Sequence, residues 1–106
     1  MRDALVVLCT CPDIEVAERL AAQLVERGLA ACVNVLPDVR SIYRWQGEVN
    51  RDREVLLVIK TLPSAYADLE AWINEHHPYD VPEVVALAAQ RVAPEYLAWM
   101  ERNVQP

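Results

Sequence analysis

The first half of the chain opens with a buried-strand pattern followed by a helical one. Residues 4–11 form an apolar run that Pro12 ends, and this run is too short for a helix. Asp13 then suits a helix N-cap, and Gly28 suits the C-terminal stop. Between them, apolar residues recur at helical spacing: Ile14, Ala17, Leu20, Ala21, Leu24 and Val25. The pattern therefore predicts a strand and then an amphipathic helix.

The middle of the chain predicts strands only. Residues 29–37 read as one strand, and residues 40–61 read as two further strand segments that meet near Gln46 and Gly47. Tyr43 and Trp45 stand two positions apart, on one face of a hairpin arm that we expect to be partly exposed. Residues 55–59 are continuously apolar, as in a central strand covered on both faces.

The last third of the sequence predicts a helix, a strand and a helix. Pro63 opens the first helix, which must end near His77 because Pro78 disfavours helical geometry in the residue before it. Residues 84–89 form an apolar strand, and Pro94 begins a short helix that turns Leu97 and Met100 inward.

This order of elements predicts an α+β fold in one domain, residues 1–106. It is the ferredoxin-like βαββαβ sandwich, with a long β-hairpin and an extra C-terminal helix, and with both main helices on one sheet face. Apolar residues make up 54% of the chain, above the roughly 45–50% of an average soluble domain. We therefore expect other subunits to cover the second sheet face or the sheet edges.

Charge and cysteine content narrow the class of protein. A net charge of −6 without a basic cluster repels phosphate backbones, so we expect no nucleic-acid partner. No segment approaches the ~20 apolar residues of a membrane span, so we expect no membrane association and a cytoplasmic protein. Three cysteines without framework spacing agree with free thiols in a reducing compartment.

Two cysteines on the first strand are the first candidates for chemistry. Cys9 and Cys11 project from the same face, with sulfurs expected roughly 7 Å apart at a rise of about 3.3 Å per residue. They are either packing residues or, after some adjustment, ligands for one soft metal ion. Cys32 is expected to pack.

His76 and His77 are the chain's two histidines, and both fall at the predicted helix end. Consecutive helical rings point about 100° apart, so the pair does not make an i, i+4 chelate. They are either cations favoured by the helix C-terminus, or one of them joins Cys9 in a site suited to copper or zinc. No nucleophile elbow, phosphate loop or zinc-protease motif is found, so we expect no enzymatic activity.

Aromatic and charged residues of the hairpin and of the segment after the second helix suggest a polar-aromatic cleft between subunits. Packing at an interface is the alternative, because interfaces also favour aromatics and arginine. The residues concerned are Tyr43, Arg44, Trp45, Glu54, Lys60, Tyr79 and Glu83.

Four segments resemble the CutA family of divalent-cation tolerance proteins: "AACVN" at 30–34, "SIYRWQGEV" at 41–49, "LLVIKT" at 56–61 and "HHPYDVPEVVAL" at 76–87. The resemblance implies a ferredoxin-like homotrimer that binds copper or another divalent cation, without catalysis. It also implies that Cys9, His76 and His77 are the metal ligands. Cys11 stands where the family is not expected to carry a thiol, so it either alters soft-metal binding or fills the core.

We therefore expect a trimeric divalent-metal (copper) binding protein linked to metal-ion tolerance. The alternative is a signalling trimer like the P-II regulators, binding a small anionic metabolite or partner protein in the cleft. Lys60 and Arg44 would supply the positive charge for that ligand.

Overall fold

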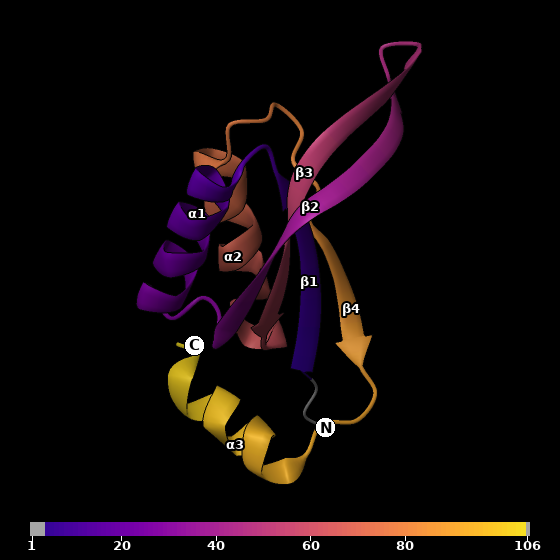
Figure 1. Cartoon of the computed structure of the whole chain (residues 1–106). Helices are drawn as coiled ribbons and strands as arrows, with labels where there is room; N and C mark the ends of the chain where they lie inside the picture. Colours follow the sequence, from indigo (N-terminus) through magenta and orange to yellow (C-terminus); the bar gives the residue numbers. More distant parts are fainter. Residues whose placement is uncertain (1–3, 106) are drawn as a thin grey trace.

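The computed structural model describes residues 4–105, and its elements follow the predicted order (Figure 1). They are β1 (Ala4–Cys11), α1 (Ile14–Glu26), β2 (Cys32–Trp45), β3 (Glu48–Thr61), α2 (Pro63–His76), β4 (Val85–Ala89) and α3 (Pro94–Asn103). The α+β class, the long hairpin and the extra C-terminal helix are confirmed.

The strand boundaries differ from the prediction between α1 and the hairpin. Residues 29–31 are not in a strand, because the backbone N–H groups of Leu29 and Ala30 turn back to the Leu24 carbonyl at the end of α1. From Cys32 to Trp45, a single strand replaces the strand predicted at residues 29–37 and the first of the two segments predicted within residues 40–61. An irregularity between Leu36 and Val39 bends this strand, and Asp38 takes a φ of 64° there, so the chain passes Pro37 without leaving the sheet.

The hairpin turn lies where the sequence predicts it. Gln46 and Gly47 both have positive φ, at 52° and 82°. Two consecutive residues of this kind match the twist of a two-residue hairpin, so β2 and β3 pair up to Trp45 and Glu48. The paired strands extend beyond the rest of the molecule as an arm (Figure 1).

All four strands form one antiparallel sheet in the order β2-β3-β1-β4. Both α1 and α2 cover the same face, as expected (Figure 1). The core on that face joins the odd-numbered side chains of β1 and β3 to the apolar stripes of the helices, and includes Val7, Cys9, Cys11, Leu57, Ile59, Leu20, Leu24, Leu69 and Ile73.

The opposite sheet face is apolar and only partly covered within one chain. Side chains alternate along a strand, so this face carries the even-numbered positions of β1 and β3. On β4, Val85 and Leu87 are 47% and 52% exposed. We call this surface the open face; it includes Val6, Leu8, Leu56, Val58, Val85 and Leu87.

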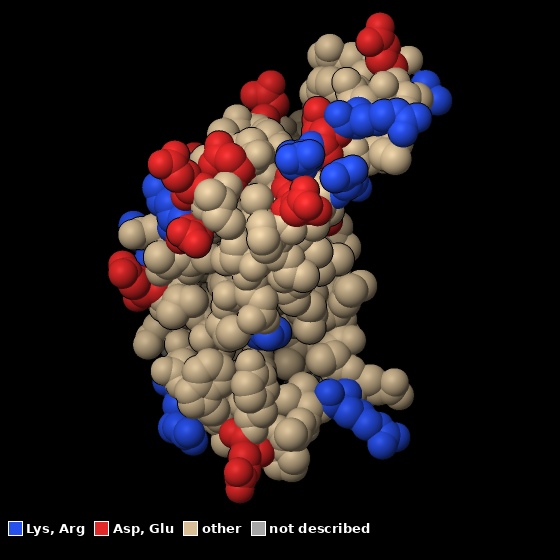
Figure 2. All heavy atoms as spheres, viewed as in Figure 1, with Lys and Arg blue, Asp and Glu red and all other residues tan. Residues whose placement is uncertain are grey.

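The last helix closes one end of the molecule. Met100 and Val104 are buried against Ala4, Ala31 and Ala65, with Leu97 packed partly buried beside them. Charged side chains gather around the hairpin arm and toward the ends of the molecule in Figure 2, and the middle of the visible surface carries few. No helix within residues 4–105 is long and apolar enough to cross a membrane.

Candidate functional site

Two cysteines of β1 and one histidine after α2 come together inside the protein. Cys9 and Cys11 occupy odd positions of β1 and therefore point toward the helices. At the end of α2, Pro78 forces His77 into an extended conformation, with φ −78° and ψ 143°. One ligating atom from each of the three residues lies within 4.8 Å of the other two. All three residues are buried, so this thiol-imidazole cluster is part of the core.

The His77 ring is held by hydrogen bonds at both nitrogens. Nε2 lies 2.8 Å from the Thr10 carbonyl oxygen, and the Tyr79 backbone N–H donates to Nδ1 over 3.1 Å. A peptide N–H can only donate, so the neutral ring accepts at Nδ1 and carries its hydrogen on Nε2. The ring is therefore fixed in orientation beside the two sulfurs.

The pKa values of the two cysteine thiols are shifted in opposite directions. Accepting a hydrogen bond from Cys9 lowers the pKa of Cys11 to about 6, against the opposing effect of burial. The same hydrogen bond and burial raise the pKa of Cys9. Burial lowers the pKa of His77, but its contacts with Cys11 and the Thr10 carbonyl outweigh burial and raise it. Of the two neighbouring thiols, Cys11 therefore has the lower pKa.

Chemically, the cluster suits metal ligation better than disulfide formation. Thiolate and imidazole are ligands that copper and zinc favour. The sulfurs lie closer than the roughly 7 Å expected from strand spacing, because the side chains turn toward each other to within 4.8 Å. A disulfide needs Cβ atoms about 4 Å apart, whereas i, i+2 positions of a strand hold them about 6.6 Å apart.

His76 and Cys32 lie apart from this cluster. The His76 ring stacks on Trp72 with centroids 4.3 Å apart, and its Nδ1 lies 2.8 Å from the Trp72 carbonyl oxygen. Cys32 lies on the other sheet face, where its sulfur accepts from Lys60 over 3.9 Å. Of the expected ligand set, Cys9 and His77 meet, His76 does not join them, and Cys11 takes the third position.

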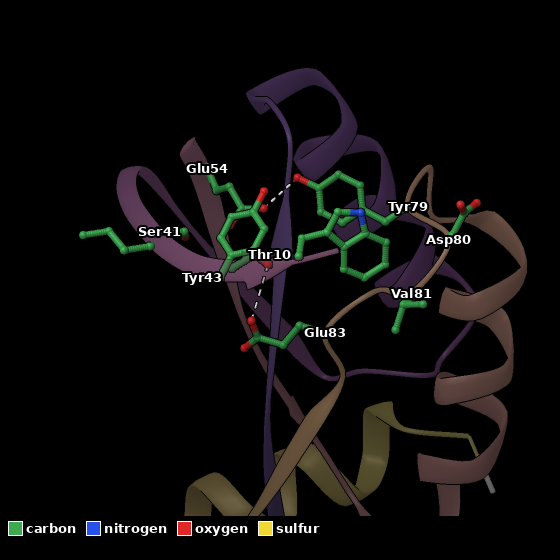
Figure 3. A pocket seen from close by; sticks show the side chains of 10 residues that line it. Thr10, Ser41, Tyr43, Glu54, Tyr79, Asp80, Val81 and Glu83 are labelled. Carbon is green, nitrogen blue, oxygen red and sulfur yellow. Dashed lines mark hydrogen bonds between the residues drawn. The ribbon is translucent and has the colours of Figure 1, made fainter. Parts of the chain in front are cut away.

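A pocket of about 590 Å³ lies next to the cluster, between the hairpin arm and the segment after α2 (Figure 3). Five of the residues expected to form a cleft line it: Tyr43, Trp45, Glu54, Tyr79 and Glu83. Sequence reasoning missed Asp80, Val81, Thr10, Ser41 and Ile42. Asp80 and Val81 adjoin the "HHPY" segment, whereas the others become pocket residues only through the strand register.

Arg44 and Lys60 do not line this pocket. The Arg44 guanidinium donates to the Gly47 carbonyl over 3.3 Å, at the tip of the arm, and the Lys60 amine donates to Asn34. In residues 4–105, the pocket lining therefore contains acidic side chains and no basic one. That charge is opposite to the one a site for an anionic metabolite requires.

Hydrogen bonds fix two of the three acidic side chains that line the pocket, Glu54 and Glu83. The Tyr79 hydroxyl donates to the Glu54 carboxylate over 2.6 Å, and the Thr10 hydroxyl donates to Glu83 over 3.4 Å (Figure 3). Burial and the Glu54 carboxylate raise the pKa of Tyr79. Thr10 and Tyr79 also hold His77, so the pocket and the thiol-imidazole cluster share supporting residues.

A family model described as "CutA1 divalent ion tolerance protein" matches residues 5–103. The chain is 51% identical over 98 residues to a "Divalent-cation tolerance protein CutA" of Thermus thermophilus, covering 92% of this chain and 95% of the relative. It is 44% identical to "Protein CutA" of Mus musculus, covering 88% of this chain and 52% of that relative. It is also 41% identical to a "Protein CutA, chloroplastic" of Arabidopsis thaliana, covering 96% of this chain and 56% of the relative.

Solved structures give the same match. The divalent cation tolerance protein of Thermus thermophilus superposes with a TM-score of 0.94 at 49% identity, covering 96% of this chain and 99% of the other. CutA1 of Oryza sativa superposes with a TM-score of 0.94 at 40% identity, covering 97% and 94%. The periplasmic divalent cation tolerance protein CutA of Archaeoglobus fulgidus superposes with a TM-score of 0.91 at 31% identity, covering 99% of this chain and 100% of the other.

Proposed function

The chain belongs to the CutA1 family of divalent ion tolerance proteins, and on this premise we propose that it binds copper or another thiophilic divalent ion at Cys9, Cys11 and His77. The observation that carries the proposal is the convergence of two sulfurs and an imidazole within 4.8 Å. Such a donor set discriminates against hard cations such as Mg²⁺ and Ca²⁺, which take oxygen ligands.

Cys11 is the residue that distinguishes this site from the ligand set that the family resemblance implies. Cys9 and His77 remain, and the Cys11 thiolate supplies the third ligand in place of His76. Zinc binds sulfur at about 2.3 Å, which places two sulfurs of one tetrahedral site about 3.8 Å apart. The cluster therefore needs to contract by no more than about an ångström. The metal also replaces one of the two hydrogen bonds of His77, because both ring nitrogens have partners.

Binding rather than catalysis is the proposed role of these residues. A cysteine nucleophile must reach its substrate, yet Cys9 and Cys11 have no exposed surface and His77 is 7% exposed. A metal ion is small enough to enter such a buried site when the surrounding structure opens locally. A larger substrate molecule enters it less readily. We accordingly propose a non-enzymatic protein.

We also propose that the protein acts as a homotrimer in the cytoplasm. The open face supports self-association, because exposed apolar side chains such as Val85 and Leu87 are stabilised when another subunit covers them. The number three follows from the family resemblance. A reducing compartment suits the three free cysteines.

Native mass spectrometry of the intact oligomer tests both parts of this proposal in one spectrum. The purified protein is titrated under reducing conditions with copper and, separately, with zinc. We expect a trimer that takes up one ion per subunit. A protein that stays metal-free in both titrations contradicts the binding proposal, and another subunit number contradicts the trimer.

Variants then identify the ligands. Cys9→Ser, Cys11→Ser and His77→Gln should each weaken zinc binding by about tenfold or more, because each removes a donor from a three-ligand set. His76→Gln is the matched control, since it makes the same change one residue away from the cluster. Equal losses in His76→Gln and His77→Gln, or none in Cys11→Ser, would overturn the assignment.

A further inference from the structure

We propose that a metal ion bound at His77 displaces the backbone N–H of Tyr79 from the imidazole ring, and that Tyr79 carries this change to Glu54 on β3. Tyr79 is then a positioning residue: it holds the ring in the metal-free protein and lowers the affinity of the site for the ion. This role rests on the proposed metal binding at Cys9, Cys11 and His77.

The hydrogen on the neutral His77 ring has one possible position in the metal-free protein. The Tyr79 N–H can only donate, so Nδ1 accepts from it over 3.1 Å and carries no hydrogen of its own. The ring hydrogen is therefore on Nε2, which donates to the Thr10 carbonyl oxygen over 2.8 Å. Both ring nitrogens thus have a partner, one as acceptor and the other as donor.

Metal ligation at either ring nitrogen removes the acceptor of the Tyr79 N–H. At Nδ1, the ion takes the lone pair that Tyr79 uses, and Nε2 still donates to Thr10, as metal-bound histidines usually do to a carbonyl or carboxylate. At Nε2, the hydrogen has to leave that atom. In a neutral imidazole it moves to Nδ1, which then donates and no longer accepts. The Tyr79 N–H is therefore displaced whichever nitrogen binds the ion.

Displacement of the Tyr79 N–H acts on β3 through the side chain of the same residue. The Tyr79 hydroxyl donates to the Glu54 carboxylate over 2.6 Å, so its backbone holds His77 while its ring holds β3. A half-buried N–H without an acceptor is unfavourable, so the backbone at Tyr79 has to move. Glu54 pairs with Val39, beside the irregularity of β2. The change at His77 is thereby transmitted to the bend of the hairpin.

These contacts lie within one chain, between side chains that their own chain already covers. Cys9 and Cys11 have no exposed surface, and His77 and Glu54 are 7% and 8% exposed. A neighbouring subunit can only lower these fractions. The hydrogen bonds that join Tyr79 to His77 and Glu54 are therefore set by the chain itself, before any subunit contact forms.

Amide NMR on the intact oligomer, with and without zinc, tests the displacement directly. A hydrogen bond from a peptide N–H to an imidazole nitrogen gives a scalar coupling between the two nitrogens, here Tyr79 N and His77 Nδ1. We expect zinc to abolish this coupling and to speed hydrogen exchange of the Tyr79 amide about tenfold or more. A coupling that persists in the zinc-bound protein, or that is absent before zinc is added, would overturn the proposal.

The same titration separates this proposal from metal binding itself. Zinc uptake that depends on Cys11, with an unchanged Tyr79–His77 coupling, overturns the displacement alone. No zinc uptake overturns both. His76→Gln is the control, because His76 lies outside the cluster, and this variant should lose the coupling on zinc addition as the unmodified protein does.

Tyr79→Phe tests whether Tyr79 opposes the ion. Phenylalanine keeps the ring and the backbone N–H but loses the bond to Glu54, so the ion displaces the residue more easily. In competition with a zinc-chelating dye, zinc should bind Tyr79→Phe about threefold or more tightly than the unmodified protein. Tyr66→Phe removes a hydroxyl that bonds Glu70, away from the cluster, and should leave zinc affinity unchanged. Equal or weaker zinc binding by Tyr79→Phe would contradict the role given to Tyr79.

Discussion

Tyr79 donates to Glu54 through its hydroxyl over 2.6 Å, and its backbone N–H donates to His77 over 3.1 Å. One residue thereby fixes both a carboxylate of the pocket and the imidazole of the cluster. Because Pro78 ends α2 just before it, the backbone at Tyr79 is free to turn across the end of the sheet. The "HHPY" segment thus positions two sites from one helix end.

Tyr79→Phe should destabilise the protein by about 1–3 kcal/mol, because the nearly buried Glu54 carboxylate loses its hydroxyl donor. Denaturant unfolding at a fixed protomer concentration measures the difference. Tyr66→Phe is the control: its hydroxyl bonds Glu70 over 3.3 Å on the exposed surface of α2, and it should cost less than about 0.5 kcal/mol. Equal costs in the two variants would contradict the structural role of the Tyr79–Glu54 bond.

All four tyrosines should ionise at higher pH in the folded protein than in the unfolded chain. The hydrogen bond to Asp52 raises the pKa of Tyr43, and burial raises the pKa values of Tyr66, Tyr79 and Tyr96. A raised pKa means that the folded state keeps its protons longer. The resulting stability is fully present below about pH 10 and is lost as the pH rises through the folded-state pKa values.

Phenolate absorbance measures this effect directly. The native titration should lie above that of the protein in denaturant, and Tyr79→Phe should remove the part that titrates last. Coincident native and denatured curves would contradict the environments described for these rings.

Cys9 and Cys11 should remain thiols under mild oxidation of the native protein. Both are fully buried, and their positions in β1 keep their Cβ atoms too far apart for an unstrained disulfide. A thiol reagent should therefore modify at most one cysteine per folded chain, Cys32, and all three after unfolding. Mass mapping that found a Cys9–Cys11 disulfide would contradict the geometry.

Much of this fold follows from local patterns that the sequence shows. The period of α1, the Gln46-Gly47 turn and the stop at Pro78 each depend on neighbouring residues, so they are predictable one segment at a time. The bend of β2 is not: Pro37 and Asp38 read as the end of a strand, yet pairing of β2 with β3 on both sides keeps them in the sheet. Tertiary pairing overrides the local signal there.

The residues of the candidate sites are likewise only partly predictable from the sequence. Cys9 and Cys11 on one face follow from strand alternation, but the choice of His77 over His76 depends on which side α2 presents to the sheet. Spacing along the chain does not contain that information. Likewise, Arg44 stands between two pocket residues in sequence and Lys60 follows Glu54 on the same strand, but both donate elsewhere, so the acidic character of the pocket appears only in three dimensions.

The two glycines should respond differently to alanine. Both have positive φ, +71° at Gly28 and +82° at Gly47, so each Gly→Ala change carries a backbone cost of about 1–2 kcal/mol. At Gly47 an added Cβ meets open space, whereas at Gly28 it lies 2.2 Å from the Gln105 Cγ. Gly28→Ala should therefore destabilise more than Gly47→Ala in denaturant unfolding. Removing the Gln105 side chain, with Gln105→Gly, should narrow the difference, although the Gln105 backbone nitrogen stays 3.3 Å from the added Cβ; an unchanged difference would show that the side-chain clash is not its source.

Substitution on the open face should separate the subunits. Leu87 lies on β4, paired with Val6 of β1, and is 52% exposed in the single chain. Leu87→Lys places an ammonium group in a surface that we propose is covered by another subunit, and a buried unpaired charge is strongly unfavourable. Light scattering during size-exclusion chromatography should report a smaller particle. Val25→Lys is the control, because Val25 is 44% exposed on α1, away from that face, and should leave the mass unchanged. If Val25→Lys dissociates the oligomer and Leu87→Lys does not, the subunits meet through the helical layer and not through the open face.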